Sequence, residues 1–230
     1  MVKYQVGITQ RVCPQQEYNS ERFCLDREWA SFMNKVETFT LIPLIPIEKN
    51  IECYWNSLNL KAIIFSGGND LSFMNPTPQN ILRDQYEKKL LKWSLKNSLP
   101  IVGICRGMQF IANFFGATIY LNSENTHVNS KHNLTWHHTE IKTNKFKKFI
   151  DQSSYTAPIV VNSYHNYFVD IDEKKFSIIA TAENDGSIEA ILHKKNPIFC
   201  CMWHPERSLA QFPGIRLIEN FILENINQGQ

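Results

Sequence analysis

Up to Gly116, the chain alternates between short apolar runs and longer amphipathic segments. Short apolar runs predict buried strands, whereas amphipathic segments of ten or so residues predict surface helices. Strands that alternate with helices are typical of an α/β fold with a mainly parallel sheet. The predicted elements are strands over Tyr4–Thr9, Thr40–Ile45, Lys61–Phe65 and Pro100–Ile104, and helices over Leu25–Thr38, Arg83–Lys96 and Arg106–Phe115.

After Gly116, short β-like runs separated by charged turns replace this alternation. These strands extend the same sheet or form a small antiparallel addition to it. The predicted elements are strands over Thr118–Leu121, Thr135–Thr143, Ile159–Val161, Phe176–Ala182, Ser187–His193 and Pro197–Trp203, and a helix over Gly214–Asn227.

The chain carries no internal repeat and no linker rich in proline, glycine or serine. We therefore predict a single domain over residues 1–230. The polar, turn-rich stretch Ser123–His132 is expected to be either a lid or an ordinary loop.

Composition narrows the functional classes. The 230 residues are 43% hydrophobic and 20% charged, which excludes a disordered chain. A formal net charge of +2 does not indicate binding to nucleic acid or to a membrane surface, so neither is an expected partner. The N-terminal segment has no signal-peptide pattern and no apolar run is long enough to span a membrane, which predicts a cytoplasmic protein.

The cysteine pattern does not indicate a disulfide-bonded or zinc-binding scaffold. The six form no C-x-x-C pair and have no zinc-type spacing with the seven histidines, so we expect reduced thiols and no metal site.

One cysteine stands out by its neighbours, in the sequence Gly103-Ile104-Cys105-Arg106-Gly107. A predicted buried strand runs into Cys105 and a predicted helix begins directly after it, as in a nucleophile elbow with cysteine in place of serine. A helix N-terminus behind a thiol favours the reactive thiolate. The alternative is an inert core thiol at the end of a strand.

A candidate base lies in the sequence Trp203-His204-Pro205-Glu206. Pro205 favours an extended backbone at His204, so Glu206 can point to the same side and hold the imidazole in one tautomer. That arrangement supplies a base and its orienting group for Cys105. The alternative is a strand-end histidine beside an exposed glutamate.

A glycine pair, Gly67-Gly68, follows another buried strand. Backbone N–H groups there, together with the N–H of Arg106, could form an oxyanion hole, although a plain turn is the alternative. Because ligands bind at the carboxyl ends of parallel strands, we expect the three motifs to meet in one site.

These motifs together resemble the class I glutamine amidotransferase superfamily, and within it the stand-alone γ-glutamyl hydrolases of the γ-glutamyl-γ-aminobutyrate hydrolase type. The resemblance implies a flavodoxin-like α/β sandwich, in which helices flank a central, mostly parallel sheet with a small antiparallel addition. The blocks that carry it are VGITQR (6–11), IIFSGGNDL (63–71), Arg83-Asp84 with Glu87, PIVGICRGMQFIANFFGATI (100–119), VNSYHNYFV (161–169), DGSIEAI (185–191) and CMWHPE (201–206).

The resemblance also implies an activity, the hydrolysis of a γ-glutamyl amide through a γ-glutamyl thioester. The triad would be Cys105, His204 and Glu206, with an oxyanion hole from the backbone of Gly67, Gly68 and Arg106. Gln109 would contact the glutamyl moiety, and its α-amino or α-carboxylate group would be held by Ser163, Tyr164, His165 and Asn166. For His165, a purely structural role is the alternative. No cofactor is implied; the expected partner is a small γ-glutamyl substrate, and a homodimer is the commonest assembly.

The connection Gln10–Arg27 carries three arginines, Arg11, Arg22 and Arg27. Arginines near the pocket mouth suit a leaving group that bears phosphate, although solvated surface charges are the alternative. One member of the family cleaves γ-glutamyl-CDP-amidate to glutamate and cytidine diphosphoramidate for capsule modification, and this chain is similar to it in size and motif blocks. That substrate is the most specific expectation.

Two other functions remain open at this point. The chain could be a glutaminase subunit that supplies ammonia to a synthetase partner, or a binding module on an inactive amidotransferase scaffold. The amino-acid sequences of residues 161–169 and 185–191 resemble those of the stand-alone hydrolases and favour that function. The presence of both a candidate nucleophile, Cys105, and a candidate base, His204, argues against the inactive module.

Overall fold

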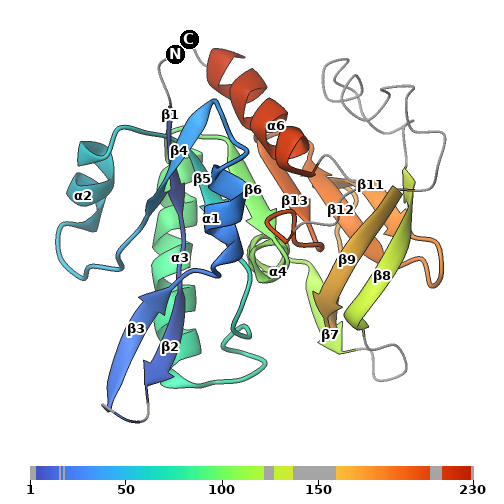
Figure 1. The fold of residues 1–230 in the computed structure, drawn as a ribbon, viewed down its shortest axis with the longest axis horizontal. Helices are drawn as coiled ribbons and strands as arrows, with labels where there is room; N and C mark the ends of the chain where they lie inside the picture. The colour runs from blue at the N-terminus through green and yellow to red at the C-terminus, as the bar shows by residue number, and fades with distance from the viewer. Residues whose placement is uncertain are drawn as a thin grey trace.

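The computed structural model describes residues 4–15, 17, 19–121, 127–136, 159–207 and 214–228. Strands and helices alternate in the first half, and strands dominate the second half (Figure 1). The strands are β1 Tyr4–Ile8, β2 Arg11–Gln15, β3 Ser20–Cys24, β4 Phe39–Pro43, β5 Leu60–Phe65, β6 Ile101–Ile104, β7 Thr118–Leu121, β8 His127–Trp136, β9 Ile159–His165, β10 Tyr167–Asp170, β11 Phe176–Ala182, β12 Ile188–His193 and β13 Ile198–Cys201. The helices are α1 Glu28–Met33, α2 Ile51–Ser57, α3 Pro78–Lys96, α4 Arg106–Phe114 and α6 Gly214–Gln228.

Within the described residues, a nine-stranded sheet has the order β4-β1-β5-β6-β13-β12-β11-β8-β9. Neighbours are parallel from β4 to β13 and antiparallel from β13 to β9. Strands β6 and β13 are buried at every position, as expected for parallel strands that are covered on both faces. The predicted α/β fold is confirmed, and its antiparallel addition continues the parallel sheet.

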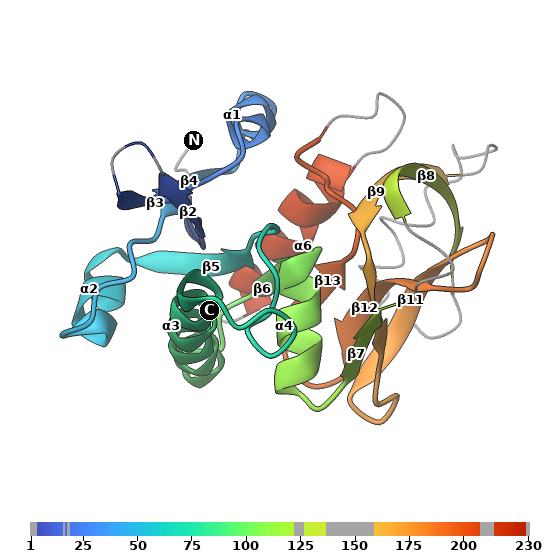
Figure 2. The same ribbon diagram turned by 90° about the horizontal axis from the view of Figure 1, so that it is seen from below.

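Helices cover both faces of the parallel strands. One hydrophobic core joins the sheet to α1 and α6, and includes Trp29, Phe32 and Phe221. A second core joins the opposite face to α2, α3 and α4, and includes Trp55 and Leu90. Figure 2 shows the resulting layers, with α3 and α4 on the side of β5 that faces away from α1.

Helix α3 begins before the predicted Arg83, at Pro78. The Thr77 side chain accepts a hydrogen bond from the Asn80 N–H, and proline at the first helical position needs no donor partner. Helix α1 is shorter than the predicted Leu25–Thr38, and its residues Trp29 and Phe32 are buried in the core.

The connection Gln10–Arg27 contains a β-hairpin that the sequence pattern did not predict. Strands β2 and β3 pair from Arg11↔Cys24 to Gln15↔Ser20 and form a separate two-stranded ribbon. Pro14 obscures the strand pattern, but the edges of such a ribbon tolerate proline. Helix α2 is also an element that was not predicted.

The polar stretch Ser123–His132 is corrected by the structure where it is described. Residues 127–132 belong to β8, which pairs antiparallel with β9, and the pairs include Val128↔Tyr164 and His132↔Val161. They are therefore part of the sheet rather than a loop or a lid. Residues 123–126, and residues 137–143 of the predicted strand Thr135–Thr143, lie outside the described residues. No helix in the described ranges has the length and apolar character to cross a membrane.

Candidate active site

Cys105 lies on a sharp turn between β6 and α4. Its backbone has φ 50° and ψ −107°, a conformation that residues other than glycine rarely adopt. Neither Gly103 nor Gly107 has room for a larger side chain. A methyl group on Gly107 would lie 2.1 Å from the carbonyl oxygen of Phe65, and one on Gly103 would lie 2.9 Å from Cys200 Sγ. The strand–turn–helix geometry of an elbow is therefore built by close backbone approach.

His204 and Glu206 lie just beyond the end of β13. Their side chains are joined by a 2.6 Å contact between His204 Nδ1 and Glu206 Oε1, and both are buried. The buried amide of Asn162 on β9 fixes the backbone of this segment. It accepts the His204 N–H at 2.8 Å and donates to the carbonyl oxygens of His204 and Arg207, both at 2.9 Å. The sequence reasoning assigned no role to Asn162.

The charges around His204 stabilise its protonated form. Burial alone would lower its pKa, but the charges of Cys105 and Glu206, and hydrogen bonds to both, raise the pKa to about 10. Cys105 and Glu206 therefore act on the same imidazole from different sides. This arrangement suits a histidine that must hold a proton beside a sulfur nucleophile.

The Gly67-Gly68 loop packs directly against His204. A methyl group on Gly67 would lie 2.7 Å from His204 Cε1, so any side chain there would displace the imidazole. Arg83 donates to the carbonyl oxygens of Ser66 at 2.8 Å, of Gly67 at 3.1 Å and of Gly68. Because a trans peptide points its N–H away from its carbonyl, Arg83 turns the N–H groups of Gly67, Gly68 and Asn69 to the opposite side.

A buried ion cluster lies behind this loop. Arg83 Nε contacts Glu87 Oε1 at 2.9 Å, and Arg106 pairs with both Glu87 and Asp84. Burial would raise the pKa of Glu87, but Arg106 and Arg83 hold it below its usual value. Asp84 also accepts the Ser72 N–H at 2.7 Å. The family resemblance includes Arg83, Asp84 and Glu87 but implies no role for them. In the structure, these residues form the cluster that supports the Gly67-Gly68 loop.

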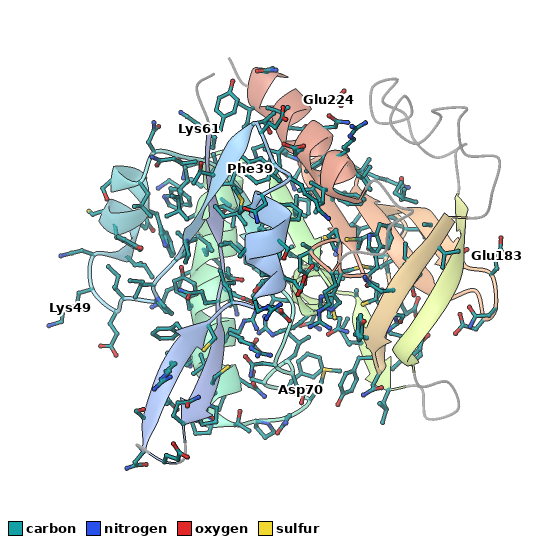
Figure 3. The ribbon with its side chains drawn as sticks, viewed as in Figure 1. Phe39, Lys49, Lys61, Asp70, Glu183 and Glu224 are labelled. Atoms are coloured by element: carbon teal, nitrogen blue, oxygen red, sulfur yellow. The ribbon has the colours of Figure 1, made fainter. Side chains whose placement is uncertain are left out.

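A cleft of about 460 Å³ opens in front of these groups. Asp70, one of its lining residues, lies between the β2–β3 hairpin and the β8–β9 pair (Figure 3). Many of the remaining lining side chains carry amide or hydroxyl groups, and two are arginines, Arg106 and Arg207. The lining residues are Val12, Pro14, Gly68, Asn69, Asp70, Asn75, Thr77, Gln79, Asn80, Cys105, Arg106, Gln109, Tyr164, His165, Asn166, Tyr167, His204 and Arg207.

Most of the predicted site residues meet at this cleft. Gly67 and Glu206 line a smaller pocket next to it, which His204 shares. Ser163 differs, because it is completely buried and does not line the cleft. Those that line the cleft are Gly68, Cys105, Arg106, Gln109, Tyr164, His165, Asn166 and His204.

Gln109 and His165 are anchored from below the cleft. Gln109 Nε2 donates to the Tyr167 carbonyl oxygen at 3.2 Å. His165 Nδ1 lies 3.2 Å from the same oxygen, and its Nε2 lies 3.3 Å from Glu189 Oε1. These contacts fix both side chains at the cleft floor, where a glutamyl group could meet them.

The three arginines predicted to contact phosphate are separated in space. Arg11 packs its side chain against Gly68 and lines the smaller pocket. Arg22 and Arg27 are exposed and line neither pocket. Arg207 lines both pockets instead. It was not predicted, although its place directly after Trp203-His204-Pro205-Glu206 could have drawn attention to it.

The described part of the chain contains no group of three or more His, Cys, Asp or Glu side chains arranged to hold a metal ion. The groups that meet at the two pockets include a thiol, a histidine–carboxylate pair and the backbone of the Gly67-Gly68 loop. Together they can perform acyl transfer through sulfur.

Comparisons with known proteins find relatives over most of the chain. The chain is 35% identical over 202 residues to the gamma-glutamyl-CDP-amidate hydrolase of Campylobacter jejuni, covering 88% of this chain and 90% of that protein. It is 27% identical over 177 residues to the glutamine-hydrolyzing GMP synthase of Chlamydia caviae, covering 77% of this chain and 30% of that protein. The crystal structure of a glutamine amidotransferase from Thermotoga maritima has the same fold, with a TM-score of 0.62 at 17% identity over 99% of this chain and 84% of that one.

A family model matches residues 6–206, which contain the elbow, the glycine loop and the histidine–carboxylate pair. The chain therefore belongs to the Peptidase C26 family, and is a glutamine amidotransferase-like hydrolase.

Proposed function

We propose that this protein is a cysteine-dependent hydrolase that cleaves a γ-glutamyl amide bond and releases glutamate. The observation that carries the proposal is the buried His204–Glu206 pair, which lies against both the Cys105 elbow and the Gly67-Gly68 loop. These groups come from separate strands and converge on one cleft, as acyl transfer requires.

In the first half of the reaction, Cys105 Sγ attacks the γ-carbonyl carbon and forms a C–S bond. The negative charge that develops on the carbonyl oxygen is stabilised by backbone N–H groups of Gly67, Gly68 and Arg106. The C–N bond then breaks, and His204 gives its proton to the departing nitrogen. The products of this half are a γ-glutamyl thioester on Cys105 and the free amine.

In the second half, neutral His204 takes a proton from water, whose oxygen attacks the thioester carbonyl. The C–S bond breaks, Cys105 returns as a thiolate and His204 is protonated again. Glu206 holds the imidazole in the tautomer that presents Nε2 to these steps. The glutamyl α-amino and α-carboxylate groups would meet Gln109, His165 and Asn166 on the cleft wall, whereas Tyr164 lies beside Arg207.

The most specific form of the proposal is that the substrate is γ-glutamyl-CDP-amidate, with cytidine diphosphoramidate as the released amine for capsule modification. The 35% identity to the Campylobacter jejuni hydrolase supports this choice. The amide side chains that line the cleft support it too, because they can donate hydrogen bonds to the oxygens of a diphosphate.

A second candidate function is a glutaminase subunit that supplies ammonia to a synthetase partner. The identity to a glutamine-hydrolyzing GMP synthase favours it. The two candidates differ in a simple way, because the hydrolase must turn over a γ-glutamyl conjugate without any partner.

The test is glutamate release by the purified chain alone, from γ-glutamyl-CDP-amidate, γ-glutamyl-p-nitroanilide and glutamine. We expect turnover of the conjugates, a γ-glutamyl adduct on Cys105 in intact-protein mass spectrometry after rapid acid quench, and at least a 10⁴-fold loss of kcat in Cys105→Ala. Cys53→Ala is the matched control, since Cys53 is exposed on α2. If the conjugates are inert and only glutamine is slowly cleaved, the glutaminase function replaces the proposed one.

A further inference from the structure

We propose that Arg207, supported by the ring of Tyr164, is the residue that recognises a phosphate group on the leaving side of the substrate. This inference rests on the proposed function and names its substrate class, a γ-glutamyl amide whose nitrogen is bonded to phosphorus. It also replaces the three arginines of the Gln10–Arg27 connection with a residue that lies in the cleft itself.

The Arg207 guanidinium lies over an aromatic ring. Its Cζ lies 4.5 Å from the centre of the Tyr164 ring, and its Nη2 donates to Asp26 Oδ2 at 2.9 Å. About 31% of the side chain remains exposed. The ring and Asp26 together restrict the motion of the guanidinium, which lowers the entropic cost of holding it in place for an anion.

Among the residues that the structure describes, most of the Arg207 donors have no hydrogen-bond partner. A guanidinium carries five N–H hydrogens. Within the described ranges, the Arg207 side chain donates one hydrogen bond, to Asp26, whereas the other cleft arginine, Arg106, pairs with Asp84 and Glu87. Arg207 is therefore the guanidinium in the cleft wall that can add contacts to a phosphate without breaking a buried pair.

The position of Arg207 matches the place of the leaving group. Its backbone N–H donates to the His204 carbonyl oxygen at 3.1 Å, and the Tyr164 ring lies edge-on to the His204 ring with 5.6 Å between centres. His204 must face the departing nitrogen to protonate it. In a phosphoramidate the phosphorus is bonded directly to that nitrogen, so the phosphate oxygens lie on the same side as Arg207 and Tyr164.

The surrounding charges set the strength of this recognition. Asp26 already pairs with Arg207, and Asp70 is the carboxylate in the cleft lining, where it accepts a hydrogen bond from Asn75. Amide donors of Asn75, Gln79 and Asn166 line the same cleft. The diphosphate would compete with Asp26 for the guanidinium, and bidentate contacts to its two singly charged phosphoryl groups favour the diphosphate.

The experiment compares two substrates in four proteins: wild type, Arg207→Gln, Asp26→Asn and Arg22→Gln. The substrates are γ-glutamyl-CDP-amidate, which carries the diphosphate, and γ-glutamyl-p-nitroanilide, which has a neutral leaving group. We expect Arg207→Gln to lower kcat/KM for the first substrate about 10- to 100-fold and to leave the second within about threefold of wild type. Arg22→Gln, an exposed arginine outside the cleft, is expected to change neither.

Asp26→Asn separates recognition from support. If Arg207 acts only through its ion pair with Asp26, Arg207→Gln and Asp26→Asn lower kcat/KM for γ-glutamyl-CDP-amidate by the same factor. If it binds phosphate, Asp26→Asn frees the guanidinium, and kcat/KM for γ-glutamyl-CDP-amidate is kept or raised.

The outcomes distinguish this inference from the proposed function. Equal losses for both substrates in Arg207→Gln, or no loss for either, would overturn the role of Arg207 while leaving the hydrolase intact. Wild-type cleavage of the p-nitroanilide but not of the CDP-amidate would also overturn it. If wild type cleaves neither substrate, the proposed function itself fails.

Discussion

Two arginine–carboxylate assemblies border the cleft, and they differ in burial. The cluster of Arg83, Glu87 and Arg106 is fully enclosed behind the Gly67-Gly68 loop. The Arg207–Asp26 pair lies at the rim, with about a third of each side chain exposed. The enclosed cluster fixes the backbone groups that every γ-glutamyl substrate would use. The exposed pair can exchange one anion for another. On the proposed function, the buried cluster supports the reaction chemistry and the exposed pair selects the leaving group.

The largest expected effect comes from breaking the buried assembly. Glu87→Gln leaves Arg83 and Arg106 as buried charges with one fewer carboxylate, and we expect the free energy of unfolding to fall by about 3–5 kcal/mol. Urea denaturation followed by circular dichroism measures it. The control is Glu183→Gln in an exposed turn at the far edge of the molecule (Figure 3), which should stay within about 0.5 kcal/mol of wild type. A similarly small effect of Glu87→Gln would remove the contrast between the two assemblies.

An intermediate effect is expected at the histidine–carboxylate pair, which lies between the two assemblies. Because Glu206 helps to raise the pKa of His204 to about 10, Glu206→Gln lowers that pKa. Protonated His204 exists below its pKa, so wild-type activity should persist on the alkaline side until the pH approaches about 10, and the variant should lose activity at lower pH. At pH 9 we expect kcat/KM to fall about 10- to 100-fold.

The measurement is the pH profile of kcat/KM for γ-glutamyl-p-nitroanilide from pH 6 to 11. Glu173→Gln, which removes an exposed carboxylate after β10, is the control and should leave the alkaline limb in place. An unshifted limb in Glu206→Gln would show that Glu206 does not hold the proton on His204.

The smallest effect is expected at the rim. Asp26→Asn removes a partly exposed ion pair, and such pairs contribute about 0–1 kcal/mol to stability. We therefore expect a change in the free energy of unfolding below about 1 kcal/mol, measured by the same urea denaturation as for Glu87→Gln. A loss comparable to that of Glu87→Gln would mean that the exposed Arg207–Asp26 pair stabilises the fold as strongly as the buried cluster of Arg83, Glu87 and Arg106.

The accuracy of the sequence predictions followed the strength of the local signal. Strands β5, β6 and β13 were predicted because continuous apolar runs must be buried on both faces of a sheet. The β2–β3 hairpin was missed because its residues are mostly exposed and Pro14 breaks the alternation. Its position depends on a distant contact, in which the Asn69 side chain bonds both the N–H and the carbonyl oxygen of Val12.

The sequence by itself determined the parallel core and the groups proposed for the reaction. Cys105 has glycines on both sides, and Glu206 follows His204 by two residues, so short-range sterics are sufficient to predict their geometry. The tertiary structure decided which distant residues support and surround them. Asn162 fixes the His204 backbone from β9, Arg83 orients the Gly67-Gly68 loop from α3, and Arg207 rather than Arg22 or Arg27 reaches the cleft. Such contacts between residues far apart in sequence arise only when the sheet brings its strand ends together, and no local pattern encodes them.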